Sequence, residues 1–239
     1  MTSVLVTHAQ QYTGPGIVSV LQKKGYTVIC HDAAFTDEAA RDEFTTTTGG
    51  IALAAQTPDE IFAELNDHPP VIRFALNNIY PNIPTPIEAL KMETLEEAFQ
   101  ALMLFPIRLA QLVLPELKKQ RSGHIAMITS ARQLQPEPGY ALATSIRAGA
   151  SAFAMALARE AAPFNIQVNA IQPNYLYSEL YYPKAQYVDD PAGREAIAQT
   201  VPMGRLGTPE EFGELLEFYI SGRSPFTTGQ EISFTGGWP

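Results

Sequence analysis

Three side chains that can take part in proton transfer lie near one another in the middle of the sequence. Ser130 ends the apolar run HIAMITS, and Tyr140 and Arg147 stand just before and within an Ala- and Leu-rich run. A serine hydroxyl is far too weakly acidic to serve unaided as a base, and an arginine with a pKa above about 12 stays protonated. A phenol, with an ordinary pKa of about 10, can accept a substrate proton once a nearby cation lowers that pKa. The residue types indicate general-base chemistry by a tyrosine with an arginine beside it.

The elements that must position these side chains alternate between short β-rich runs and longer helical patterns. Helical patterns cover residues 93–119 and 144–162, and Pro163 closes the second. The strand runs lack polar alternation, which is typical of parallel strands covered by helices on both faces. They are VLV (4–6), TVIC (27–30), VIRFAL (71–76), HIAMITS (124–130), IQVNAI (166–171) and EISFTG (231–236). We therefore expect an α/β fold, with one domain over residues 1–239.

A segment rich in Tyr, Pro and Asp covers residues 174–190, directly after one of these strand runs. We expect a long loop there, at the carboxyl edge of the sheet, where open α/β sheets bind their ligands. Ser130 also ends a strand at that edge. The sequence thus predicts a small-molecule site between Ser130 and the loop.

The composition excludes several other partners. The formal net charge is −9 without a Lys/Arg cluster, and both nucleic acid and an anionic membrane require a basic surface. No apolar stretch reaches the roughly 20 residues that a membrane span needs. Cys30 has no second cysteine to pair with, and the start MTSVLVT has no leader pattern, so we expect a cytoplasmic protein. The four histidines show no metal-ligand spacing, so no metal site is expected.

Several runs occur together in an order that resembles the short-chain dehydrogenase/reductase superfamily. They are Ser130 at its strand end, ATSIRAGA (143–150), VNAIQP (168–173), RLGTPEE (205–211) and TGQEISFTGG (228–237). The resemblance covers nearly the whole chain. It implies a doubly wound, Rossmann-type, parallel seven-stranded sheet with helices on both faces, and a homotetramer assembled through the long helices.

The first turn departs from the superfamily pattern TGxxxGxG, whose glycines let the backbone approach a dinucleotide pyrophosphate. Here the turn reads VTHAQQYTGPG, and alignment on Thr7 leaves His8 and Tyr12 at the first two glycine positions, with Gly14 at the third. A tyrosine ring at a position where backbone must contact phosphate fills the nucleotide site. We therefore expect no nucleotide cofactor.

A second register of the first turn takes Gly14 and Gly16 as the GxG pair. It places Ser19 at the third glycine and starts the motif too far beyond the strand, so we disfavour it. The next expected motif, NNAG, ends here in Ile79 and Tyr80, which again puts an aromatic ring in place of glycine. Asp32 would bind a ribose in a dehydrogenase, but with the glycines lost we expect a loop or cap residue.

These departures resemble the halohydrin dehalogenase branch of the superfamily. The likeness rests on Tyr12, HDAAF (31–35), PNYL (173–176) and Tyr182-Pro183. It implies that a halide leaves a small vicinal halohydrin as the neighbouring hydroxyl closes to an epoxide, and that small anions open epoxides in reverse. Carried over by position, the anion and substrate pocket comprises Tyr12, Tyr80, Pro173, Asn174, Tyr175, Leu176 and Tyr182.

The catalytic set that the resemblance implies is incomplete. Ser130 is expected to bind the substrate oxygen, and Arg147 stands where this branch has an arginine. Ala143 occupies the position of the expected tyrosine, four residues before Arg147 and 13 after Ser130. Tyr140 is the nearest phenol, on roughly the same helical face if the helix begins by Gly139, so it is a candidate for a relocated base.

Two other interpretations of Ala143 stay open. Ala143 could replace an original tyrosine in an engineered, silenced dehalogenase, or belong to a relative that binds without turnover. An NAD(P)-dependent reductase with an unusual first turn stays open as a second function, because of the overall superfamily pattern.

Overall fold

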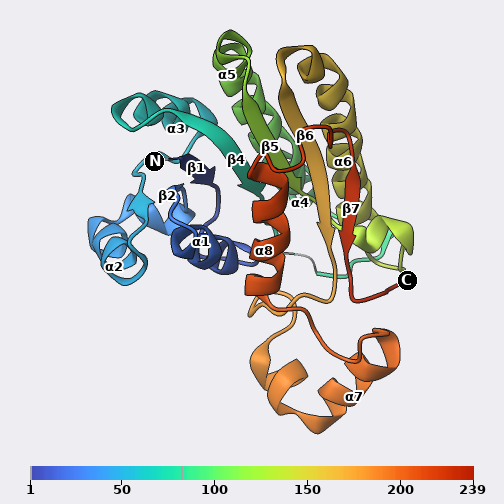
Figure 1. Cartoon of the computed structure of the whole chain (residues 1–239). Coiled ribbons are helices and arrows are strands. Elements are labelled where there is room, and N and C mark those ends of the chain that lie inside the picture. The colour runs from blue at the N-terminus through green and yellow to red at the C-terminus, as the bar shows by residue number, and fades with distance from the viewer. Residues whose placement is uncertain (1, 82) are drawn as a thin grey trace.

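The computed structural model describes residues 2–81 and 83–239. Its strands form one parallel sheet in the order β3-β2-β1-β4-β5-β6-β7, which confirms the predicted fold class (Figure 1). The strands are β1 (Ser3–Val6), β2 (Thr27–Cys30), β3 (Ile51–Ala52), β4 (Val71–Asn77), β5 (Gly123–Ile128), β6 (Ile166–Pro173) and β7 (Glu231–Phe234). The chain winds outward from β1 in one direction and from β4 in the other. The switch point between β1 and β4 is where ligands of such sheets bind.

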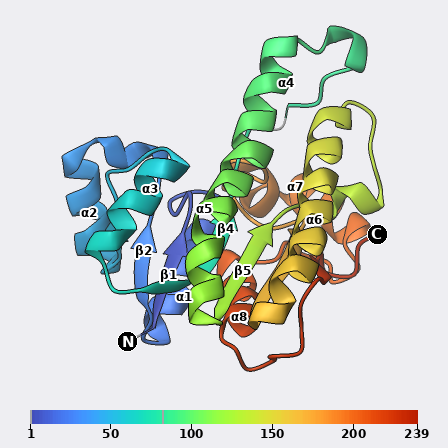
Figure 2. The same cartoon turned by 90° about the horizontal axis from the view of Figure 1, so that it is seen from above.

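Helices cover both faces of the sheet (Figure 2). One core cluster packs the sheet against α1 (Gly14–Lys23), α2 (Glu38–Thr48) and α8 (Pro209–Ile220). The opposite cluster packs it against α3 (Pro58–Glu64), α5 (Phe105–Gln120) and α6 (Ala141–Ala161). Successive strand residues join opposite clusters, as Leu5 and Val6 do, because side chains alternate across a strand.

Both helical patterns identified in the sequence form long helices. Residues 93–119 fall in α4 (Met92–Phe99), a π-helical turn (Gln100–Leu104) and α5. α6 begins three residues earlier than expected and ends at Ala161, before the short turn that contains Pro163.

Two helical stretches, Met92–Gln120 and Ala141–Phe164, are long and apolar enough to cross a membrane by length and composition alone. The expectation that no apolar stretch approaches that length was therefore wrong. Each stretch also supplies fully buried side chains to the core beneath the sheet, Leu109 from the first and Ala154 from the second. The apolar faces of both are thus used in packing against the strands.

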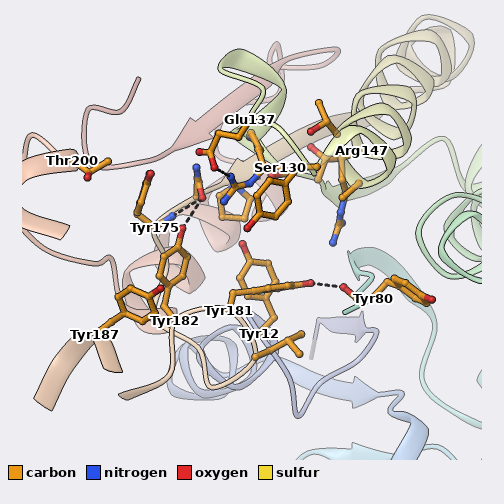
Figure 3. A pocket seen from close by; sticks show the side chains of 18 of the residues that line it. Tyr12, Tyr80, Ser130, Glu137, Arg147, Tyr175, Tyr181, Tyr182, Tyr187 and Thr200 are labelled. Carbon is orange, nitrogen blue, oxygen red and sulfur yellow. Dashed lines mark hydrogen bonds and ion pairs between the residues drawn. The ribbon is translucent and has the colours of Figure 1, made fainter. Parts of the chain in front are cut away.

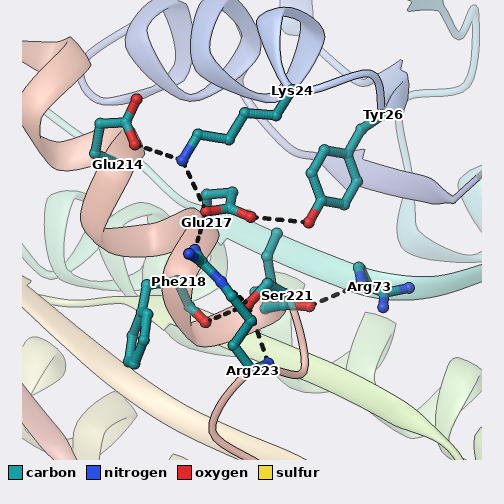
Figure 4. A network of polar contacts seen from close by, with 9 residues as sticks. Lys24, Tyr26, Arg73, Glu214, Glu217, Phe218, Ser221 and Arg223 are labelled. Atoms are coloured by element: carbon teal, nitrogen blue, oxygen red, sulfur yellow. Dashed lines mark hydrogen bonds and ion pairs between the residues drawn. The ribbon is translucent and has the colours of Figure 1, made fainter.

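A buried carboxylate fastens α8 to the opposite end of the sheet from the switch point (Figure 4). Glu217 is 5% exposed and accepts hydrogen bonds from Lys24 Nζ at 2.9 Å, from the Tyr26 hydroxyl at 3.0 Å and from the guanidinium of Arg223. Lys24 also pairs with Glu214 at 2.5 Å. A buried charge is tolerated only with such partners. The network therefore ties α8 to the chain between α1 and β2.

The segment expected as a long loop after β6 extends beyond the carboxyl edge of the sheet. Within it lies a π-helical turn (Ala185–Asp189), and α7 (Pro191–Thr200) follows directly; both lie below the strand ends in Figure 1. A bridge between Leu176 and Gly207 closes the base of this segment. Among residues 2–81 and 83–239, no group of three His, Cys, Asp or Glu side chains is arranged to hold a metal ion.

Candidate active site

A cavity of about 360 Å³ lies between the carboxyl edge of the sheet and the segment that carries α7 (Figure 3). It brings together side chains from the turn after β1, the ends of β5 and β6, the start of α6 and the α7 segment. The predicted site residues that line it are Tyr12, Tyr80, Ser130, Tyr140, Ala143, Arg147, Pro173, Asn174, Tyr175 and Tyr182.

Leu176 is the predicted pocket residue that the structure places elsewhere. Its side chain is fully buried in the core cluster with Phe212 and does not line the cavity. The bridge to Gly207 fixes the backbone here so that Leu176 faces the core.

The first turn keeps a backbone conformation suited to glycine at both positions where glycine is lost. The φ angles are 48° at His8 and 54° at Tyr12, in a left-handed region that costs a residue with a Cβ about 1–2 kcal/mol. Gly14 is required for a different reason, because a Cβ there would lie 2.5 Å from the carbonyl oxygens of His8 and Ala9. Gly16 lies inside α1 and packs against Pro209, which rules out the register that used Gly14 and Gly16 as the phosphate-binding pair.

Several backbone N–H groups of this turn are already bonded within the protein. The N–H of Gln10 donates to Asp32 Oδ2 at 2.9 Å, and that of Ala9 to the carbonyl of His31 at 3.0 Å. Asp32 Oδ1 accepts the N–H of Ala34 at 3.1 Å, so this carboxylate caps a short helical turn, as expected. A pyrophosphate needs free N–H donors, and these residues do not fit one.

Aromatic packing fills the space beside the turn. The His8 ring lies 5.0 Å from the His31 ring and 5.6 Å from the Phe105 ring, centroid to centroid. Burial lowers the pKa of His8 and lowers the pKa of His31 to about 3. Both imidazoles are therefore neutral near pH 7 and form part of an uncharged wall.

Arg147 places a buried positive charge at the cavity. The residue is 7% exposed and donates from Nη1 to the carbonyl of Ile128 at 2.8 Å and from Nη2 to that of Asn78 at 2.7 Å. Within the described residues it forms no ion pair with a carboxylate. A buried cation held only by neutral carbonyls favours an anion or a phenolate nearby.

Ser130 lines the same cavity with its proton available. It precedes the helical turn Ala131–Leu134, and its Oγ accepts the N–H of Arg132 at 3.2 Å. Because that bond uses Oγ as acceptor, the hydroxyl can still donate to a substrate oxygen. This arrangement supports the oxygen-binding role implied by the resemblance.

The expected base is absent from α6. Ala143 lines the cavity, so a tyrosine at this position would enter it. A helical face shared with Ala143 was expected for Tyr140 if the helix began by Gly139, and this condition is not met because α6 starts at Ala141. Tyr140 is the residue before the helix, with φ −108° and ψ 16°. Its ring instead lies against Arg132, with Cζ 4.3 Å from the ring centroid.

Asn174 also lines the cavity. Its Oδ1 accepts the hydroxyl of Tyr182 at 3.2 Å and the N–H of Tyr175 at 3.0 Å. Its Nδ2 is buried and has no hydrogen-bond partner, which is costly unless a ligand accepts from it. Burial raises the pKa of Tyr12, Tyr175 and Tyr182, so these phenols stay neutral donors near pH 7.

Among the other residues that line the cavity, four that the sequence patterns did not single out are Arg132, Glu137, Tyr181 and Tyr187. Arg132 and Glu137 form an ion pair at 2.7 Å. Tyr181 directly precedes the predicted Tyr182, and the Tyr-rich composition of the segment was the available signal. Adjacent residues of a loop face different directions, so composition could not assign the second tyrosine.

The chain is similar to known proteins over nearly its whole length. A family model described as enoyl-(acyl carrier protein) reductase matches residues 12–239. The chain belongs to the short-chain dehydrogenase/reductase superfamily. A 3-oxoacyl-(acyl-carrier-protein) reductase of Vibrio harveyi is 27% identical over 98% of this chain and 95% of its own length. An uncharacterized oxidoreductase of Bacillus subtilis is 25% identical over 99% of this chain and 98% of its own length.

The solved structures add a second kind of relative. A halohydrin dehalogenase bound to ethyl (2S)-oxiran-2-ylacetate is 33% identical, with a TM-score of 0.96, over 100% of this chain and 97% of the other. A structure described as a dehalogenation enzyme is 29% identical, with a TM-score of 0.94, over 100% and 98% of the two chains. The chain is thus similar to reductases in the sequence comparison and to dehalogenases among solved structures.

Proposed function

We propose that this protein converts small vicinal halohydrins to epoxides with release of halide, and opens epoxides with small anions in reverse, without a nucleotide cofactor. The observation that carries this proposal is the first turn. His8 and Tyr12 occupy its glycine positions, two of its N–H groups are bonded to Asp32 and His31, and Tyr12 lines the cavity itself. A turn of this kind does not fit the pyrophosphate of a nicotinamide dinucleotide, so we do not expect hydride transfer from that cofactor.

The chemistry that the cavity would support follows from its charges and donors. The substrate hydroxyl gives its proton to a phenolate of the protein. The substrate oxygen then attacks the neighbouring carbon, the carbon–halogen bond breaks, and the halide leaves with the bonding pair. Ser130 donates to the reacting oxygen, and the positive charge of Arg147 favours the phenolate. The unpaired Nδ2 of Asn174 donates to the released halide.

The size of the cavity also favours a small substrate. A volume of about 360 Å³ falls at the low end of the roughly 300–1,000 Å³ typical of small-molecule sites. The lining combines hydroxyl donors with aromatic rings from Tyr12, Tyr175 and Tyr182, which suits a short carbon chain with an oxygen at one end and an anion at the other.

Two other functions have a specific observation in their favour. The sequence similarity to reductases favours NAD(P)H-dependent reduction, although the bonded first turn opposes it. Ala143 in place of the expected base favours a protein that binds a small anion or epoxide without turnover.

The deciding experiment measures halide release and epoxide formation on a panel of short vicinal haloalcohols, for this protein and for its Ala143→Tyr variant. Turnover by either supports the proposal, and absence of turnover in both would refute it. Titration with NADPH, followed by its fluorescence, runs beside this assay. Binding below the millimolar range would favour the reductase, whereas bromide binding without any turnover would favour the binding protein.

A further inference from the structure

Loss of the tyrosine at position 143 leaves the proposed function without an evident proton carrier, and the contacts of the cavity phenols distinguish among candidates. The hydroxyl of Tyr182 is used on Asn174, and the ring of Tyr140 lies on Arg132 rather than Arg147. Of these three phenols, Tyr181 is the one whose pKa the positive charge of Arg147 affects, by opposing the rise that burial causes. Figure 3 shows the Arg147 guanidinium directed toward the hydroxyl end of this ring.

Tyr181 and Arg147 are anchored on the same short stretch of backbone after β4. Arg147 Nη2 donates to the carbonyl of Asn78 at 2.7 Å, and the Tyr181 hydroxyl donates to the carbonyl of Tyr80 at 2.9 Å. The Tyr181 ring is further fixed by an edge contact with Tyr12, at 4.9 Å between ring centroids. The phenol and the cation therefore approach each other from opposite sides of the cavity and are held there by independent contacts.

We propose that Tyr181, on the segment between β6 and α7, is the proton-transferring residue of this site and takes the part that position 143 cannot. This inference rests on the proposed function. Tyr181 reaches the cavity from the wall opposite α6, so the loss of the helical tyrosine removes a side chain without removing the phenol–arginine pair. Ser130 keeps its role as the second donor to the substrate oxygen.

In the epoxide-opening direction the step balances as follows. An anion attacks one epoxide carbon, the carbon–oxygen bond breaks with its electron pair on oxygen, and that oxygen takes the proton of the Tyr181 hydroxyl. The phenolate left behind lies beside Arg147. The epoxide oxygen replaces the carbonyl of Tyr80 as the acceptor of this hydroxyl. Solvent water then returns a proton to the phenolate, so the net reaction consumes the epoxide, the anion and one proton.

The protonation state of Tyr181 sets the favoured direction at neutral pH. Burial raises the pKa of Tyr181 above its usual range, and the nearby Arg147 only partly opposes this. The phenol is therefore protonated at rest, which suits donation to an epoxide better than abstraction from a halohydrin. The charged group that faces this phenol is Arg147 from α6, and the neutral phenol of Tyr12 from the first turn packs against its ring.

The test is Tyr181→Phe, which removes the hydroxyl and keeps the ring against Tyr12. Tyr177→Phe is the matched control, because Tyr177 lies on the same segment and its hydroxyl bonds to the exposed Glu179 at 2.6 Å. The assay is azide-dependent opening of a small epoxide, with kcat and KM measured separately and the melting temperature recorded for each variant. We expect Tyr181→Phe to lower kcat by about 100-fold or more with little change in KM, and Tyr177→Phe to retain activity.

A double variant separates a proton carrier from a structural residue. Adding Ala143→Tyr to Tyr181→Phe restores a phenol beside Arg147 and is expected to recover most of the lost kcat. Activity of Tyr181→Phe within a few-fold of the parent, or a loss that Ala143→Tyr fails to restore, would overturn the inference. A parent without turnover and an active Ala143→Tyr variant would also overturn it while leaving the proposed function standing. Inactivity of both defeats the proposed function itself.

Discussion

The left-handed backbone at Tyr12 predicts that a glycine at this position is more stable than an alanine, the reverse of the usual order. At most positions a protein with Gly is less stable than the same protein with Ala by about 0.5–1 kcal/mol, because Gly loses more backbone entropy on folding. At φ 54° an Ala would still pay the left-handed cost of about 1–2 kcal/mol, which Gly avoids. Tyr12→Ala and Tyr12→Gly lose the same ring contact with Tyr181, 4.9 Å between centroids, so that loss cancels between them. The Gly variant should be the more stable by about 1 kcal/mol, or roughly 2–4 °C in melting temperature for a chain of this size.

Urea unfolding and thermal melting of the two variants measure this difference. Thr46 is the control position, because it is exposed within α2 and has helical backbone geometry. There Thr46→Ala should be more stable than Thr46→Gly by about 1 kcal/mol, the opposite order. A Tyr12→Ala variant as stable as Tyr12→Gly, with the expected order at Thr46, would refute the left-handed strain assigned to the turn.

Three further outcomes follow from the contacts described above. Glu217→Gln keeps the side-chain shape but turns an amide donor toward cations, and should lower stability by about 2 kcal/mol; a double-mutant cycle with Tyr26→Phe that shows no coupling would contradict this. Asn174→Asp replaces the unpaired donor by a negative charge and should weaken bromide binding by about tenfold or more. The probe is the fluorescence of Trp238, whose ring lies 5.4 Å from that of the cavity residue Tyr175, centroid to centroid; unchanged affinity would remove Asn174 from the anion site. Since the pKa of Tyr181 is raised, the rate of epoxide opening should stay level across neutral pH and fall only above about pH 10. The rate of halohydrin closure needs the phenolate, so over the same neutral range it should rise about tenfold per pH unit. A level pH profile for closure would contradict a phenolate base.

The sequence predicted the sheet and the turn more closely than the cavity. Apolar runs without alternation gave six strands, whereas Ile51–Ala52 is too short to carry a pattern and forms only because it pairs with β2. His8 and Tyr12 could be recognised as lost glycines because the physical demand at those positions is local. Leu176 could not be assigned correctly, since its direction depends on a bridge to Gly207, which lies far along the chain.

The two candidate phenols show the same distinction within one site. The spacing from Arg147 predicted Tyr140 on the same helical face. Spacing does not show where a helix begins, and α6 begins one residue after Tyr140. Tyr181 depends on the carbonyl of Tyr80, which no local pattern connects to it. Arg147 itself is held by the carbonyls of Ile128 and Asn78, so its position does not depend on which residue stands at 143. A cation fixed by strand-end carbonyls can serve a phenol from either wall of the cavity, and for this reason the missing helical tyrosine is compatible with a working site.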